Sequence, residues 1–406
     1  MGFGRLLPVV ALATVLTACG GGGAGGSSAS GNGSGSGSGS STLSPQAQLG
    51  EKIFSDTALS ASGLQSCASC HVAQYAFTAD PTASGPDHGS PVPLGGPNLD
   101  QPGFRNTPSL MYASYTPAFY YDSSGDPYGG FFRDGRAATL AIQATQPFTT
   151  PFEMANADAA AVIAKLQTRP YLADFEAIYG AAALSDPQTA LQDMGAALAA
   201  FETEDPQFHP FSSKYDAFLA GKVQLTAQEQ RGLADFNDPS KGNCAACHSV
   251  TTGPGGRPPD FTDHSFHALG VPRNPAIPAN REPRFFDLGL CGPLRIDLRR
   301  ERRYCGYFKT PTLRNAARRR YFFHNGRFGS LREVLRFYVR RDLDAALWYP
   351  RSGGRVLKFD DLPASLRVNV DTSDAPLNRD PGDPPALSEV EIGQVVAFLE
   401  TLSDAD

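Results

Sequence analysis

The sequence is poor in several features that mark common classes of protein. Beyond residue 16, no segment reaches the ~18 consecutive apolar residues that a membrane-spanning helix needs. Strand-like alternation of apolar and polar residues is scarce, which argues against a mainly β fold. The net charge of −6 gives no overall bias toward nucleic acid. Methionine and tryptophan are also rare, with four and one residues.

Glycine and proline, in contrast, are abundant, with 42 and 33 residues among 406. Residues 20–42 hold 11 Gly and 8 Ser, a composition that predicts a flexible tether with a root-mean-square reach of roughly 27 Å. The 364 residues from Leu43 onward contain enough apolar residues for a sizeable core, and their number suggests about two domains. Collagen, coiled coil and wholesale disorder are therefore excluded.

The first 18 residues resemble a bacterial lipoprotein signal. One positive charge precedes the apolar stretch 6–16, and Leu16-Thr-Ala18 places small residues before Cys19. This pattern predicts cleavage before Cys19 and a lipid anchor on its thiol, followed by the tether over 19–42. An ordinary secretory signal that is cut elsewhere is the alternative. Both predict export to the periplasm, and Gly20 after the cysteine favours the outer membrane.

Four of the seven cysteines form two C-x-x-C-H motifs. Two thiols at this spacing can add to the two vinyl groups of a haem, while the adjacent imidazole reaches the iron. One zinc site built from both pairs, or two redox disulfides, would leave the histidine after each pair unexplained. The residues assigned to two covalent c-type haems are Cys67, Cys70 and His71 in the first motif, and Cys244, Cys247 and His248 in the second.

Cys291 and Cys305 remain after these assignments. In an oxidising compartment, an even number of remaining cysteines favours a structural disulfide, which would stabilise the fold by ~3 kcal/mol.

The sequence elements around the first motif recur in the same order around the second. A helix signal precedes each motif, with Ser44-Pro45 before the first and the capping box Thr226 to Glu229 before the second. Thr107-Pro-Ser-Leu110 is echoed by Thr310-Pro-Thr-Leu313, and 131–140 is echoed by 322–331. These repeats predict two homologous haem domains, 43–221 and 222–406. A capping box from Ser388 to Glu391 then predicts a terminal helix that carries the apolar residues Ile392, Val395, Val396, Leu399 and Leu402.

With these motifs in an exported chain, residues 43–402 resemble the bacterial di-haem cytochrome c peroxidases and their MauG branch. The resemblance implies a mainly α, loop-rich fold with two class I cytochrome c-like domains related by internal duplication, whose cores are completed by haem. It also implies hydrogen peroxide reduction at the N-terminal haem, with electrons delivered through the C-terminal haem by a cytochrome c or cupredoxin. MauG-like oxidation of a protein aromatic side chain and a non-enzymatic di-haem electron carrier are the alternatives.

The most specific stretch of the resemblance is Asp134-Gly-Arg-Ala-Ala-Thr-Leu-Ala-Ile-Gln143, followed by Pro151-Phe-Glu153-Met. The resemblance places Gln143 and Glu153 over the open face of the N-terminal haem. A positioned carboxyl can move the proton that O–O cleavage requires, and Gln143 would orient the oxidant. From the local pattern alone, Thr150-Pro-Phe-Glu153 is also a capping box that would start a helix.

The resemblance also assigns the axial positions of the irons. His71 is the proximal ligand of the first iron, and His88 lies close to where some family members carry a removable distal histidine. No methionine follows the second motif, and the second axial position falls at Tyr338, where the MauG branch carries tyrosine. Ser330 to Glu333 predicts a helix on which Leu331, Val334, Leu335 and Tyr338 share one face. A core tyrosine with another hydrogen-bond partner is the alternative for Tyr338.

Two positions depart from the family pattern. The family usually has a tryptophan relay directly before Asp-Gly-Arg, whereas this chain has Arg133, and Trp348 is far away in sequence. Any electron route between the haems must then use Phe131, Phe132 or the haem edges. A calcium ion is also typical and maps onto the Asn106 side chain and carbonyls near Arg319 and Tyr321, although the usual proline at the latter position is absent.

A basic block lies between Leu294 and Arg341, where 14 Arg and one Lys face three acidic residues. Export argues against a nucleic-acid partner for this block. A solvated face, pairing with haem propionates and docking of an acidic electron donor are the three uses that the pattern leaves open.

Overall fold

The structure is a computed structural model that describes residues 43–80 and 91–405. The predicted signal segment, the lipid-bearing Cys19, the glycine-serine tether and His88 all lie outside these residues. From Leu43 onward the chain forms one compact unit. The boundary near Gly221 between two haem domains stays a prediction.

The helices begin where the sequence offers a capping side chain. The Ser44 hydroxyl accepts a hydrogen bond from the Ala47 amide at the start of α1 (Pro45–Ser55). Complete capping boxes start α8 (Ala227–Asn237) and α10 (Glu389–Glu400). These three predicted helix starts are confirmed, because each side chain satisfies an amide that would otherwise have no partner.

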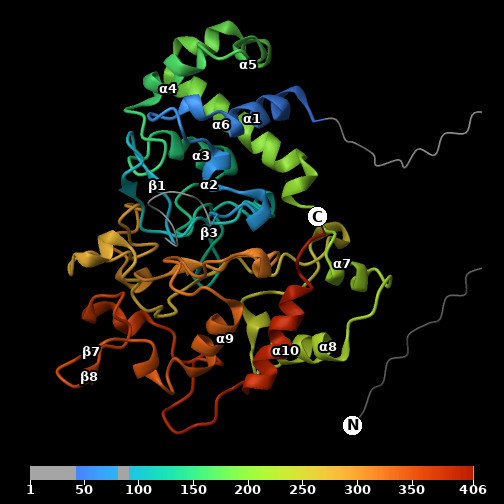
Figure 1. Ribbon diagram of the computed structural model, residues 1–406, viewed down its shortest axis with the longest axis vertical. Coiled ribbons are helices and arrows are strands. Elements are labelled where there is room, and N and C mark those ends of the chain that lie inside the picture. Colours follow the sequence, from blue (N-terminus) through green and yellow to red (C-terminus); the bar gives the residue numbers. More distant parts are fainter. Residues whose placement is uncertain (1–42, 81–90, 406) are drawn as a thin grey trace, which may run out of the picture. The chain divides into compact units, whose positions relative to one another are not determined.

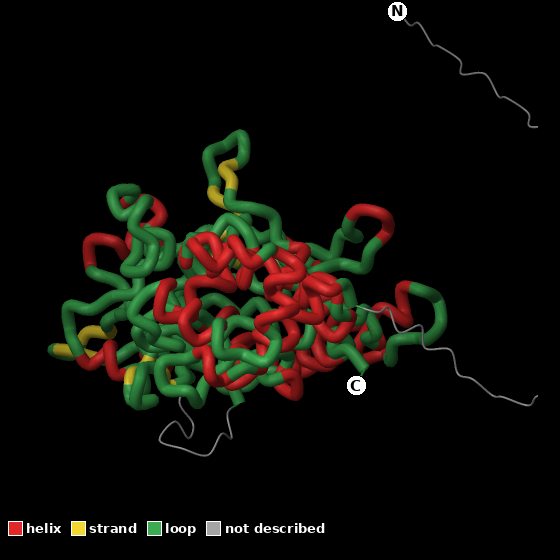
Figure 2. Tube along the Cα trace, turned by 90° about the horizontal axis from the view of Figure 1, so that it is seen from above, coloured by secondary structure: helices red, strands yellow, loops and turns green. Residues whose placement is uncertain are grey.

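Seven more α-helices lie among the described residues, together with short 3-10 helices. They are α2 (Cys67–Cys70), α3 (Leu140–Thr145), α4 (Ala159–Leu166), α5 (Leu172–Tyr179), α6 (Pro187–Glu204), α7 (Lys214–Leu219) and α9 (Leu331–Arg340). The strands are all two residues long and pair antiparallel: β1 (Leu94–Gly95) with β2 (Gln101–Pro102), β3 (Tyr120–Tyr121) with β4 (Pro127–Tyr128), β5 (Phe266–His267) with β6 (Phe308–Lys309), and β7 (Arg351–Ser352) with β8 (Arg355–Val356). Long loops join these elements (Figure 2), so the expected mainly α, loop-rich character is confirmed. No helix among the described residues is long and apolar enough to cross a membrane.

Two helix pairs cross at close range, and each crossing has a glycine at the contact. In Figure 1, α1 lies beside α6, and α8 lies beside α10. A Cβ atom added at Gly50 of α1 would lie 2.0 Å from the Ala197 carbonyl oxygen of α6. One added at Gly232 of α8 would lie 1.9 Å from the Gln394 carbonyl oxygen of α10. Only glycine allows the backbones to approach this closely.

Aromatic side chains close the core beside each crossing. Phe54 of α1 packs edge-on against Phe201 of α6, with 5.5 Å between the ring centroids. Phe236 of α8 packs in the same manner against Phe398 of α10, at 5.2 Å. Gly232 and Phe236 therefore occupy the same places in the α8–α10 pair as Gly50 and Phe54 occupy in the α1–α6 pair. Origin of the two helix pairs by internal duplication remains our proposal.

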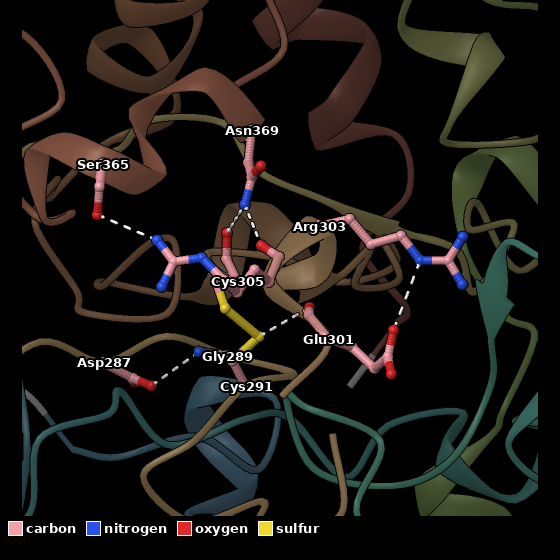
Figure 3. The surroundings of a disulfide bond; sticks show 9 residues. Asp287, Gly289, Cys291, Glu301, Arg303, Cys305, Ser365 and Asn369 are labelled. Atoms are coloured by element: carbon pink, nitrogen blue, oxygen red, sulfur yellow. Dashed lines mark hydrogen bonds and ion pairs between the residues drawn. A yellow bond between two sulfur atoms is a disulfide. The ribbon is translucent and has the colours of Figure 1, made fainter. Parts of the chain in front are cut away.

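The disulfide between Cys291 and Cys305 closes the loop that carries five of the 14 arginines of the basic block (Figure 3). The Asn369 side-chain amide donates hydrogen bonds to the carbonyls of Arg302 (2.7 Å) and Cys305 (3.0 Å). Arg302 reaches the Ser365 hydroxyl at 3.2 Å. The loop is therefore held against the segment 365–369 near one of its sulfur atoms.

Candidate functional site

The first C-x-x-C-H motif occupies α2 and the residue that ends it. The amide of His71 donates to the Cys67 carbonyl at 2.9 Å, which closes the single turn that carries both thiols. The His71 ring nitrogen Nδ1 lies 2.9 Å from the Phe77 carbonyl oxygen. Because a carbonyl can only accept, Nδ1 carries the proton and Nε2 keeps its lone pair for a metal.

The second motif repeats this arrangement. The His248 amide donates to the Cys244 carbonyl at 2.8 Å, and His248 Nδ1 lies 3.0 Å from the Phe261 carbonyl oxygen. Burial lowers the pKa of both imidazoles, to about 4 for His248. Both rings are therefore neutral, which is the form that binds iron.

None of the four motif cysteines forms a disulfide in the structure. Burial raises the pKa of Cys67, Cys244 and Cys247 to about 12. Cys67 and Cys70 line one cavity, whereas Cys244 and Cys247 line another. The described residues thus contain neither the two redox disulfides nor a single zinc site made from both pairs. A thiol pair with a neutral histidine beside each cavity fits c-type haem.

The two cavities adjoin each other. The cavity at Cys67 has a volume of about 150 Å³, and the cavity at Cys244 has a volume of about 330 Å³. We call the residues that line both cavities the partition. They are His71, Asn106, Thr107, Pro108, Leu110, Phe132, Arg133 and Gln143.

Glu153 faces the cavity at Cys67. Burial raises the pKa of its carboxyl, while the positive charge of Arg136 and a hydrogen bond from Thr150 oppose this shift. The helix start expected from the local pattern is wrong, because residues 151–154 form a turn and the next helix begins at Ala159. Ala155 takes a left-handed φ of 54°, which ends the turn before a helix can form.

Gln143 lies on α3 and is half-buried in the partition. The Thr139 side chain caps α3 by accepting from the Ile142 amide at 3.1 Å. Gln143 and Glu153 therefore line the same cavity as His71, from two different segments.

Tyr338 lies on α9 and lines the cavity at Cys244 together with His248. Burial raises the pKa of its phenol, and the nearby Cys247 and Cys244 raise it further. Leu331, Val334 and Leu335 of the same helix also line this cavity. The four residues expected on one helix face thus contribute to one wall.

Asn106 is buried where two distant segments meet. Its side-chain amide donates to the carbonyls of Tyr321 (3.0 Å) and Phe323 (3.3 Å), and its own amide donates to the His324 carbonyl (2.7 Å). Tyr321 was one of the two residues expected to offer a carbonyl to calcium. The second, Arg319, is not among the hydrogen-bond partners of Asn106 in the described residues, but it lines the cavity at Cys244.

The basic block divides into several environments. Arg314 and Arg341 are fully buried, and Arg314 forms a bidentate pair with Asp216 at 2.8 and 3.0 Å. Lys309 and Arg319 line the cavity at Cys244, whereas Arg299 and Arg300 are exposed on the disulfide loop. A single solvated face does not describe this block.

Glu202 is a residue of the site that the sequence interpretation missed. Its side chain is 4% exposed, lines the cavity at Cys67, and has an oxygen, Oε2, without a hydrogen-bond partner. Burial raises the pKa of this carboxyl to about 8. The available signal was its spacing, since Glu202 follows Leu198 by four residues and so continues the buried face of α6.

Comparison with known proteins agrees with this geometry. Residues 44–224 match the family model described as di-haem cytochrome c peroxidase. The methylamine utilization protein MauG of Paracoccus denitrificans (strain Pd 1222) is 36% identical over 88% of both chains. The cytochrome-c peroxidase IdrP1 of Denitromonas iodatirespirans is 26% identical over 98% of this chain and 92% of its own.

Among solved structures, the diheme peroxidase BthA from Burkholderia thailandensis E264 superimposes with a TM-score of 0.81. It is 41% identical and covers 89% of this chain and 86% of its own. The sequence relatives and this fold agree with the two thiol–histidine cavities. The chain therefore belongs to the family of bacterial di-haem cytochrome c peroxidases and MauG proteins, and it is an oxidoreductase.

Proposed function

We propose that this protein reduces hydrogen peroxide in the cavity at Cys67, with electrons supplied by a small redox protein such as a cytochrome c or cupredoxin. The observation that carries the proposal is Glu153, a carboxyl with a raised pKa that lines the same cavity as the neutral His71. A buried carboxyl with a raised pKa binds a proton more readily than an exposed one, and it can release that proton to a bound oxidant.

The residues of the chain have separate tasks in this proposal. His71 and His248 would hold the two irons through Nε2, and the four motif thiols would anchor the macrocycles. When bound, the haems supply the redox chemistry of peroxide reduction and electron uptake. Glu153 moves a proton between the two peroxide oxygens, because the leaving oxygen must be protonated to depart as water. The Gln143 amide orients the oxidant by a hydrogen bond from the partition.

MauG-like oxidation of an aromatic side chain on another protein is the second candidate. Two observations favour it. Tyr338 lines the same cavity as His248 and would help to hold the iron there. The relative at 36% identity carries the MauG name. In this candidate the proton chemistry of Glu153 is the same, and the electrons come from the target protein instead of a small redox protein.

One experiment separates the two candidates. The di-haem protein is mixed with stoichiometric hydrogen peroxide, and optical and electron paramagnetic resonance spectra are followed with and without a reduced small cytochrome. Rapid oxidation of the cytochrome supports peroxide reduction. A long-lived oxidised state whose lifetime does not change when the reduced cytochrome is added supports the MauG-like reaction. Spectra that do not change on adding peroxide would refute both.

The same proposal includes the setting of the protein. We propose that the chain is exported to the periplasm and that a lipid on Cys19 anchors it to the outer membrane. We also propose that calcium binds at Asn106. Labelling cells with a radioactive fatty acid, and comparing the wild type with Cys19→Ser, tests the anchor. Unlabelled wild-type protein would refute it.

A further inference from the structure

Three cationic side chains that line the cavities form no ion pair within the described part of the chain. Arg133, Lys309 and Arg319 all line the cavity at Cys244, and Arg133, as part of the partition, lines the cavity at Cys67 as well. None of the three forms an ion pair with any residue in 43–80 or 91–405. We call them the cation cluster.

The hydrogen bonds of the cluster leave donors unused. Arg133 donates from Nε to the Asn106 carbonyl at 2.8 Å, and Lys309 donates from Nζ to the Gly130 carbonyl. The two terminal nitrogens of Arg319 donate to the carbonyls of Thr312 (3.1 Å) and Arg314 (2.7 Å), while its buried Nε has no partner. These contacts fix the side chains in place but do not compensate their charge.

Asp134 and Asp287, the carboxylates that attract Lys309 and Arg133, are already paired with other arginines. Arg105 donates to Asp134 at 2.6 Å and forms a bidentate pair with Asp287 at 2.6 and 2.7 Å. Arg136 also donates to Asp134, at 3.0 Å. Two carboxylates and two guanidinium groups therefore balance one another, and the three charges of the cation cluster remain.

The members of the cluster lie close to one another. Arg133 lies near Arg319 and Arg105, and Lys309 lies near Arg133. All three side chains are partly buried. Like charges held together with limited access to water are stabilised when an anion joins them.

We propose that the cation cluster is an anion-binding site for the propionate carboxylates of the haems, and that Arg133 contacts carboxylates from both cavities. This inference rests on the proposed haem occupancy of both cavities. Each haem carries two propionates on the edge opposite its vinyl groups, so attachment through the thiols directs the carboxylates away from the cysteines. Planar guanidinium groups pair with such carboxylates in a bidentate manner. The cluster then links the two cofactors electrostatically through the partition.

Resonance Raman spectra of the ferric di-haem protein test the proposal, because the bending bands of the propionates respond to their hydrogen bonds. Arg133→Met, Lys309→Met and Arg319→Met are compared with Arg300→Met, a control on the exposed disulfide loop. We expect shifted propionate bands in the three cluster variants at unchanged haem content, and wild-type bands in the control. Wild-type bands in all three cluster variants would overturn the proposal.

The midpoint potentials of the two haems give a second readout. Loss of a cation beside a propionate stabilises the ferric state, so the potential falls. Arg133→Met should lower both potentials, whereas Lys309→Met should lower mainly that of the His248 haem. An effect of Arg133→Met on one haem alone would refute its contact with both cavities.

A crystal structure of the wild-type di-haem protein covers the case in which a variant fails to acquire haem. Propionate oxygens within hydrogen-bond distance of Lys309 Nζ, Arg133 and Arg319 would support the proposal. A free anion at the cluster, or propionates that point elsewhere, would overturn it. Glu153→Gln separates this proposal from the function, because it should stop the peroxide reaction and leave the propionate bands unchanged.

Discussion

At the scale of single residues, Glu153 is where the proposed chemistry depends on one proton. Glu153→Gln keeps the size of the side chain and removes its acid–base function. We expect the rate of the reaction with hydrogen peroxide to fall at least ~100-fold, the low end for a lost general acid–base group. Stopped-flow spectroscopy of the di-haem protein measures this rate.

Glu51→Gln is the matched control, because Glu51 is an exposed glutamate on α1. It should react with peroxide at the wild-type rate. If Glu153→Gln also reacts at that rate with full haem content, then Glu153 has no part in proton transfer.

Glu202 should make stability depend on pH in a direction opposite to that of an ordinary ion-paired carboxylate. Its folded pKa of about 8 lies above the usual 4.5, so the folded state binds more protons between these values. Stability therefore falls as pH rises through this interval, by up to ~1.4 kcal/mol per pH unit. Glu202→Gln removes this contribution, so the variant should gain stability relative to wild type from pH 5 to pH 8.

Urea unfolding of the di-haem protein at several pH values measures this difference, again with Glu51→Gln as the control. Parallel stability profiles for wild type and Glu202→Gln would show that Glu202 is already ionised in the folded state.

At the scale of elements, the crossing of α8 and α10 depends on one glycine. A Cβ at position 232 would lie 1.9 Å from a backbone oxygen of α10, which cannot move away without shifting the helix. We expect Gly232→Ala to lower the free energy of unfolding by ~2 kcal/mol or more, as overpacking does. Denaturant unfolding monitored by circular dichroism measures the change.

Gly393→Ala is the control within α10 itself. Its added Cβ would meet only the flexible end of the Arg332 side chain, at 3.1 Å. Since alanine favours a helix over glycine by up to ~1 kcal/mol, this variant should be as stable as wild type or more so. Equal losses in both variants would mean that the close approach of the helices is not the cause.

Much of the helical framework was predictable because its signals are local. Ser44, Thr226 and Ser388 each precede an apolar stripe, and each caps the expected helix. Thr150 and Glu153 have the same local pattern, but the left-handed backbone at Ala155 prevents a helix there. That conformation depends on tertiary packing, which a four-residue pattern does not contain.

Part of the site was also predictable from local signals. The histidines and thiols follow from motifs of five residues, whereas the cation cluster gathers Arg133, Lys309 and Arg319 from positions far apart in sequence. No spacing rule links these positions. The burial of Glu202 likewise depends on the cavity that α6 borders.

At the scale of the whole molecule, Asn106 joins segments more than 200 residues apart in the chain, since its amide meets the carbonyls of Tyr321 and Phe323. If calcium binds there, removal with a chelator should lower the unfolding temperature, and added calcium should restore it. At 100 times the dissociation constant, binding would stabilise the fold by ~2.7 kcal/mol. Calorimetric titration of the chelated di-haem protein measures the affinity.

Asn369→Ala is the matched control for Asn106→Ala, because Asn369 also donates to two backbone carbonyls. We expect Asn106→Ala to weaken calcium binding at least tenfold and Asn369→Ala to leave it unchanged. Equal affinity in both variants would exclude Asn106 as a ligand.

The partition has a consequence for how this protein can vary among species. Arg133, Gln143 and Asn106 border both cavities at once. Any substitution at these positions therefore affects both sites. An exchange that suits one site but harms the other would be removed by selection. Partition residues should therefore change in correlated groups among close relatives, whereas residues that border one cavity, such as Tyr338 and Glu202, remain free to diverge independently.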